Sequence, residues 1–224
     1  MPNILVLIVT FLLLFAPLHP AVATEPGHDF AQWEKEVAAY EMHDRANPPP
    51  KGGLLFAGSS TIRMWTTLAT DFPTYAVVNR GLGGTEIVDC THFADRLIFP
   101  CAPKTIFLRA GTNDLHNGRT PAQVFADFRE FVATIHARLP AAEIWFISSC
   151  PNLARLSETD KNRELNALIK RYARWKRRVH YLDTWSMSLD AAGQVRPDLF
   201  LADKLHFNAA GYQLLAARVR PHLP

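Results

Sequence analysis

Short apolar runs alternate along this chain with longer amphipathic segments. Runs of strand length lie at Leu54–Ala57, Tyr75–Val78, Thr105–Ala110, Ile144–Ser148 and Val179–Leu182. They are continuous rather than alternating, as expected for strands that helices cover on both faces. Between them, helical periodicity predicts helices over Glu86–Ile98, Pro121–Leu139 and Thr159–Lys176. This alternation predicts an open parallel sheet of five strands with helices on both sides.

Two further helices flank this pattern. The segment 29–46 has apolar residues at three- and four-residue spacing, and a final helix begins near Asn208, which can cap it. The pattern shows neither an internal repeat nor a second domain. We therefore expect residues 24–224 to form one domain.

The first residues carry a different signal. Ile4–Ala16 is apolar except for Thr10, and a small-x-small motif follows at Ala21–Ala23. A bilayer-spanning helix needs roughly 20 apolar residues, so this shorter run predicts a signal peptide over residues 1–23, cleaved after Ala23, and an exported protein. The segment before the run lacks Lys and Arg, so an uncleaved N-terminal anchor stays open as the alternative.

The composition is that of an ordinary globular protein. Of 224 residues, 48% are hydrophobic and 20% charged, which excludes a disordered or fibrous chain. The net charge of +3 is mild and requires neither nucleic acid nor a membrane as partner. Cys90, Cys101 and Cys150 are expected to be small buried residues without an obligatory disulfide, although the sequence leaves a pairing open.

Small and polar residues gather where the predicted strands end. The motifs in strand order are "GSS", "NRGLGG", "AGTND" and "SSCPN", and "LADKLHFN" follows the last strand. In an open parallel sheet the carboxyl ends of the strands share one edge, where sites form. The shared placement predicts a functional site at that edge.

Ser60 is the candidate nucleophile. It would stand at the start of the segment "TIRMW", where free N–H groups and the helix dipole favour developing negative charge. For "GSS" alone, the alternative that Ser59 or Ser60 only caps a helix is the more common case.

A serine nucleophile needs a base, and "DKLH" offers one. Asp203 and His206 are three residues apart, so on a tight turn the carboxylate can bind one imidazole nitrogen while the other faces Ser60. The same spacing also fits surface residues or half of a metal site.

Attack of a serine on a carbonyl group forms an oxyanion, which requires hydrogen-bond donors in fixed positions. The backbone N–H groups of Ser60 and Gly84 and the side-chain amide of Asn113 are the candidates, and ordinary turn chemistry is the alternative reading of "GLGG" and "GTND". Position 86 is Glu rather than the third glycine of a dinucleotide loop, and neither a phosphate loop nor an H-E-x-x-H zinc motif occurs. We therefore expect no cofactor and no metal.

These residues resemble the SGNH, or GDSL-like, hydrolases. "FAGSST", "NRGLGG", "AGTND" and "DKLHFNAAGY" occur in that family's order over Leu54–Tyr212. The resemblance implies a three-layer α/β/α sandwich with a five-stranded parallel sheet and metal-free ester hydrolysis. It also implies a catalytic triad of Ser60, Asp203 and His206 and an oxyanion hole of Ser60, Gly84 and Asn113.

One departure from the family pattern is Ser59, which stands where the family usually has Asp; the form "GSS-x-IR-x-W" resembles a bacterial subgroup. Trp65 is expected to pack in the core and Arg63 to pair with a carboxylate. Asp114 is expected to support its loop. Asn152 and Arg155 are expected near the pocket, without an assigned role.

The expected function is therefore a serine esterase acting on a small-molecule, glycan or lipid ester, with a carbohydrate O-acetyl esterase as one form. The alternatives are a lipid esterase or lysophospholipase, a thioesterase, and a glycan-binding module without activity. Fold alone does not choose among these substrates.

Overall fold

A computed structural model describes residues 27–224. The predicted signal peptide, residues 1–23, lies outside these described residues. Within 27–224, none of the helices has both the length and the apolar composition needed to cross a bilayer.

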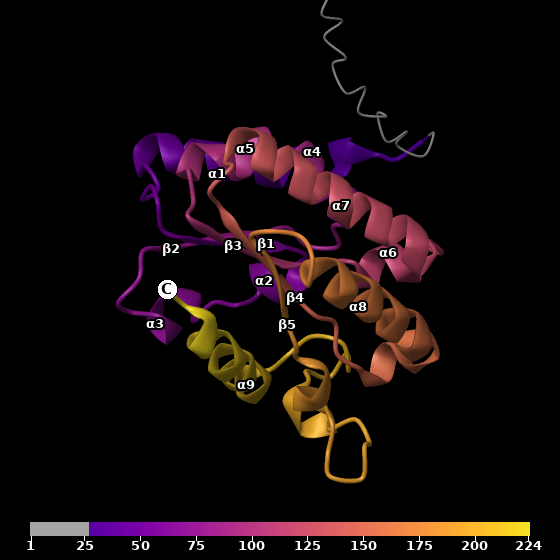
Figure 1. The fold of residues 1–224 in the computed structure, drawn as a ribbon. Helices are drawn as coiled ribbons and strands as arrows, with labels where there is room; N and C mark the ends of the chain where they lie inside the picture. Colours follow the sequence, from indigo (N-terminus) through magenta and orange to yellow (C-terminus); the bar gives the residue numbers. More distant parts are fainter. Residues whose placement is uncertain (1–26) are drawn as a thin grey trace, which may run out of the picture.

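Five parallel strands form one sheet in the order β2-β1-β3-β4-β5 (Figure 1). The strands are β1 Leu54–Gly58, β2 Val77–Gly81, β3 Thr105–Arg109, β4 Glu143–Ile147 and β5 Val179–Leu182. The prediction of a five-stranded parallel sheet is confirmed. The second strand begins two residues later than predicted, because Tyr75 closes a turn in which its N–H donates to the carbonyl of Phe72.

The helices are α1 Glu34–Ala46, α2 Ser60–Arg63, α3 Leu68–Asp71, α4 Ile87–His92, α5 Ala94–Leu97, α6 Thr112–His116, α7 Pro121–Arg138, α8 Thr159–Ala173 and α9 Ala209–Val219. The single helix predicted over Glu86–Ile98 is wrong, because the chain breaks at Phe93 between α4 and α5. The Phe93 side chain is buried against the core, which explains why helical periodicity runs through the break.

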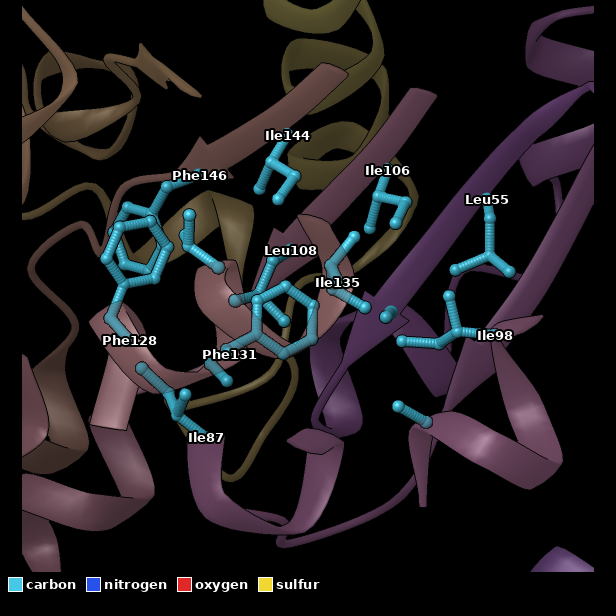
Figure 2. Close-up of a cluster of buried hydrophobic side chains, with 14 of the residues drawn as sticks. Leu55, Ile87, Ile98, Ile106, Leu108, Phe128, Phe131, Ile135, Ile144 and Phe146 are labelled. Carbon is cyan, nitrogen blue, oxygen red and sulfur yellow. The ribbon is translucent and has the colours of Figure 1, made fainter. Parts of the chain in front are cut away.

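Helices cover both faces of the sheet, which makes three layers (Figure 1). One core lies between the sheet and the layer that contains α1, α4, α5, α7 and α8. Leu55, Ile106 and Ile144 of three strands meet Phe131 and Ile135 of α7 there (Figure 2). Every one of these side chains is fully buried.

The opposite face carries an aromatic core beneath α2, α3 and α9. The rings of Phe56 and Phe107, on neighbouring strands, stack with centroids 4.7 Å apart. Trp65 meets Phe56 edge-on at 5.5 Å and lies 5.7 Å from Tyr212 of α9. The expectation that Trp65 packs in the core is confirmed.

The three cysteines are free thiols, with Cys101 and Cys150 buried and Cys90 partly buried. Arginine side chains contact two of them: Arg80 approaches the sulfur of Cys101, and Arg109 that of Cys150, each at 3.6 Å.

Asp114 joins two helices inside the molecule. Its Oδ1 accepts a hydrogen bond from the backbone N–H of Ile87 at 3.0 Å, which links α6 to the start of α4. The other carboxyl oxygen is buried and has no hydrogen-bond partner among residues 27–224. Burial is the main cause that raises the pKa of Asp114 to about 7, and the nearby Glu86 acts in the same direction. The side chain supports its loop, as expected.

Replacing Asp114 with Asn should change how stability depends on pH. The native state keeps the Asp114 proton up to about pH 7, whereas an unfolded carboxyl releases it near its ordinary value of 3.8. Folding therefore binds a proton between those values, and the contribution of Asp114 to the stability of the wild type declines as pH rises through that window, by up to about 1.4 kcal/mol per pH unit. Asp114→Asn should lack this contribution, as urea unfolding from pH 4 to pH 8 would measure.

The exposed residue Asp160 provides a matched control, Asp160→Asn. If the stability of Asp114→Asn followed that of the wild type at every pH, Asp114 would already be ionised in the native state and this account would be wrong.

Candidate active site

Ser60 lies where the chain turns sharply after β1. Gly58 ends the strand with φ +134°, and a Cβ at this position would lie 2.0 Å from the carbonyl oxygen of Arg109. Only glycine allows this approach. The N–H of Ser59 then donates to that same carbonyl at 3.0 Å, and α2 begins with Ser60.

Neither serine hydroxyl caps α2. Ser59 occupies the N-cap position, but its side chain makes no capping hydrogen bond. The Oγ of Ser60 instead lies 2.8 Å from Nε2 of His206. The capping alternative therefore does not describe this motif.

Two contacts fix α2 against distant parts of the chain. The hydroxyl of Tyr212, in α9, donates to the carbonyl of Thr61 at 2.9 Å. The side-chain amide of Asn79, in β2, donates to the carbonyl of Ile62 at 2.7 Å. These hydrogen bonds hold the residues that directly follow Ser60.

Asp203 and His206 meet on one tight turn. Oδ2 of Asp203 lies 2.7 Å from Nδ1 of His206, and its Oδ1 accepts the N–H groups of Leu205 and His206. The side-chain hydrogen bond with His206 is the main cause that lowers the pKa of Asp203 to about 2, and the two backbone donors add to it. The carboxylate is therefore ionised at neutral pH. With Nδ1–H donating to this carboxylate, Nε2 is free to accept the hydroxyl proton of Ser60.

The loop that carries this pair is tied back to its own ends. The N–H of Leu201 donates to the carbonyl of His206 at 2.8 Å, and Phe200 pairs with Phe207 in a short antiparallel bridge. Directly afterwards, Asn208 caps α9 by accepting the N–H groups of Ala210 and Gly211, as predicted.

Asn113 lines the same cavity as Ser60, and Gly84 belongs to a neighbouring loop. The amide nitrogen of Asn113 donates to the carbonyl of Thr85 at 3.1 Å, so the "GTND" and "GLGG" loops contact each other. Gly84 is an exposed residue of the second loop. Within residues 27–224, the backbone N–H groups of Ser60 and Gly84 donate no hydrogen bond, so both are available to a ligand.

A cavity of about 30 Å³ lies beside Ser60. It is lined by Ser59, Ser60, Thr61, Arg109, Thr112, Asn113, Cys150, Asn152, Arg155, Phe200, Leu205, His206 and Phe207. It thus brings together Ser60, Asn113 and His206, with Asp203 behind the imidazole. Gly84 is not among the described residues that line it.

Sequence reasoning assigned no role to Asn152 and Arg155 and overlooked Arg109. All three side chains line the cavity. Arg109 donates to the carbonyl of Ser148 and lies 5.7 Å from the centroid of the Phe207 ring. The available signal was position, since Arg109 ends the third strand and the other two residues follow the fourth.

The expected ion pair of Arg63 is wrong. In the part of the chain that the structure describes, Arg63 forms no salt bridge with a carboxylate. Its guanidinium lies against Gly83, where an added Cβ would be 2.8 Å from Nε of Arg63. A Cβ at position 83 would therefore require the guanidinium to shift.

A much larger hollow, of about 770 Å³, lies between α1 and β2. None of the predicted site residues lines it, so size alone does not identify the site. Over residues 27–224, His, Cys, Asp and Glu side chains form no group of three or more that could hold a metal ion.

Comparisons with known proteins identify a family for this chain. Residues 53–214 match the model of the GDSL-like lipase/acylhydrolase family. No curated protein matches the chain significantly.

Among solved structures, the fold resembles three bacterial proteins. A protein from Streptococcus pneumonia, provisionally described as a platelet activating factor, aligns with TM-score 0.77 and 21% identity over 86% of this chain and 94% of that chain. A GDSL-like lipase from Bacteroides thetaiotaomicron aligns with TM-score 0.70 and 18% identity over 87% and 98%. The acetylxylan esterase Axe2 from Geobacillus stearothermophilus, in a catalytic mutant, aligns with TM-score 0.61 and 14% identity over 76% and 94%.

At these identities the structures support the fold alone, whereas the family model covers most of the chain and identifies the family. This chain belongs to the GDSL-like lipase/acylhydrolase family and is an ester-hydrolysing enzyme.

Proposed function

We propose that the protein is a serine esterase that removes short acyl groups, acetyl above all, from large alcohols such as carbohydrates. The observation that carries this proposal is the unbroken hydrogen-bond chain from Ser60 through His206 to Asp203, with distances of 2.8 and 2.7 Å. A nucleophile, a base and an orienting carboxylate in this order are the machinery of acyl transfer.

In the proposed first half-reaction, Ser60 attacks the ester carbonyl while Nε2 of His206 takes the hydroxyl proton. The ionised Asp203 orients the ring and stabilises the imidazolium. The N–H groups of Ser60 and Gly84 and the amide of Asn113 bind the tetrahedral oxyanion. His206 then protonates the leaving alcohol, and an acyl-enzyme on Ser60 remains.

In the second half-reaction, water takes the place of the alcohol. His206 removes a proton from this water, which attacks the acyl carbon. Collapse of the second tetrahedral intermediate returns the proton to Oγ of Ser60 and releases the acid. The cycle needs no group beyond these side chains and backbone donors.

The shape of the site favours a small acyl group. The cavity of about 30 Å³ beside Ser60 is far below the 300–1,000 Å³ that is usual for sites enclosing a whole ligand. His206 lines this cavity, and the side chains of His206 and Asp203 are 23% and 47% exposed. A small cavity beside a partly exposed imidazole suits an acetyl ester whose bulky alcohol stays outside the cavity, and the resemblance of the fold to the acetylxylan esterase Axe2 supports such a substrate.

Export is part of this proposal. A signal peptide over residues 1–23 would deliver the enzyme to the periplasm or the extracellular space, where acetylated polysaccharides are available as substrates. Acetylated xylan and acetylated peptidoglycan are the first polymers to compare.

The role of Ser60 can be separated from that of its neighbour. Ser60→Ala should lower kcat for p-nitrophenyl acetate by about 10⁴ or more, since loss of a triad nucleophile removes most of the rate. Ser59→Ala should keep most of the activity, because the Ser59 side chain makes no hydrogen bond that holds α2. Equal rates for Ser60→Ala and the wild type would refute the assignment.

Chain length tests the acyl preference. Values of kcat/KM for p-nitrophenyl esters should fall from acetate to butyrate to octanoate, by about tenfold or more overall, because forcing extra methylenes into a filled space costs about 1–3 kcal/mol. A rise with chain length would instead identify a lipid esterase. Faster turnover of an acetyl thioester than of the matching oxygen ester would identify a thioesterase.

A further inference from the structure

The side-chain amide of Asn113 is held from both ends. Its Nδ2 donates to the carbonyl oxygen of Thr85 at 3.1 Å. Its Oδ1 accepts a hydrogen bond from Nη1 of Arg155 at 3.0 Å. The same Nη1 also donates to the carbonyl of Thr112 at 3.2 Å, so Arg155 contacts the Asn113 loop twice.

These partners permit only one orientation of the amide. A backbone carbonyl can only accept hydrogen bonds, and a guanidinium can only donate them. If the amide were flipped, two oxygens would face each other at Thr85 and two donors would face each other at Arg155. The flip would lose both hydrogen bonds, so the nitrogen of Asn113 must lie on the Thr85 side.

The Nδ2 group has a second N–H that Thr85 does not use. Asn113 and Arg155 both line the cavity beside Ser60. The hydrogen bond from Arg155 to Oδ1 also polarises the amide, which strengthens its remaining N–H as a donor. Arg155 thus sets both the direction and the strength of this donor.

We propose that Arg155 is a positioning residue for ester hydrolysis, which acts by fixing the amide of Asn113 with an N–H directed at the oxyanion. This inference rests on the proposed function, in which Asn113 is an oxyanion donor. It assigns Arg155 an effect on the transition state and none of its own on substrate binding.

Arg155 is itself held for this task. Its backbone N–H donates to Oδ1 of Asn152 at 3.0 Å, and the preceding N–H of Ala154 donates to the carbonyl of Lys204 at 3.2 Å. The segment is thereby attached to the turn that carries Asp203 and His206. Within residues 27–224, Arg155 has no carboxylate in an ion pair that would draw its guanidinium away from Asn113.

A double-mutant cycle tests the inference. Arg155→Met, Asn113→Ala and the double variant are compared with the wild type, using kcat and KM for the neutral substrate p-nitrophenyl acetate. Arg155→Met should lower kcat about ten- to hundredfold, the range found when partners that orient metal ligands are removed, and change KM by less than about twofold. Asn113→Ala should lower kcat about 10²–10³-fold.

Coupling between the two residues is the decisive readout. In the Asn113→Ala background, Arg155→Met should cost less than about a further twofold, since the group it positions is gone. Arg171→Met is the matched control, because Arg171 is exposed on α8 and should leave kcat unchanged in both backgrounds. If thermal melting shows that Arg155→Met folds poorly, the same cycle is made with Arg155→Lys, which should show a smaller effect that likewise disappears in the Asn113→Ala background.

Two results would overturn the inference, and they differ in what else they reject. If Arg155→Met costs the same factor with and without Asn113, Arg155 acts independently, and a rise in KM would indicate direct substrate binding. In that case the proposed esterase mechanism stands. If Asn113→Ala leaves kcat unchanged, the oxyanion role of Asn113 fails and the positioning role of Arg155 fails with it.

Discussion

Parallel pairing of the five strands is the constraint on which the candidate site depends. The register carries each strand to the same edge of the sheet, so Gly58, Gly81 and Arg109 end their strands side by side. The loops that follow these strands therefore begin next to one another in space. A parallel sheet therefore brings short motifs that are far apart in the sequence to one place, without long-range pairing between the motifs themselves.

The pair that completes the site comes from beyond the sheet. His206 lies 146 positions after Ser60, and the contact between them depends on how α9 packs. Tyr212 supplies this link, because its ring lies in the aromatic core beside Trp65 while its hydroxyl binds the carbonyl of Thr61. Tyr212 thus links the packing of the aromatic core to the position of the nucleophile. A substitution in this core is therefore expected to shift Ser60.

Much of this arrangement could be predicted from the sequence, for physical reasons. Continuous apolar runs predict the strands, and cap residues such as Asn208 predict where helices begin, because both signals are local in the sequence. The motifs that follow the strands predict where the functional residues lie. The break at Phe93 was not predictable, since a buried ring satisfies helical periodicity whether or not the helix continues. Contacts that depend on tertiary packing could not be predicted either. Arg63 packs against Gly83 and pairs with no carboxylate among residues 27–224, and Arg155 reaches Asn113 from another loop.

The proposed mechanism requires the hydroxyl of Ser60 to be the activated group in this molecule. Covalent labelling with a fluorophosphonate probe, followed by mass spectrometry of the digested protein, measures this directly, because such probes react with serines that a neighbouring base activates. We expect one label per chain, on Ser60, and loss of labelling when the imidazole of His206 is removed. Labelling on another residue, or no labelling of the folded protein, would contradict it.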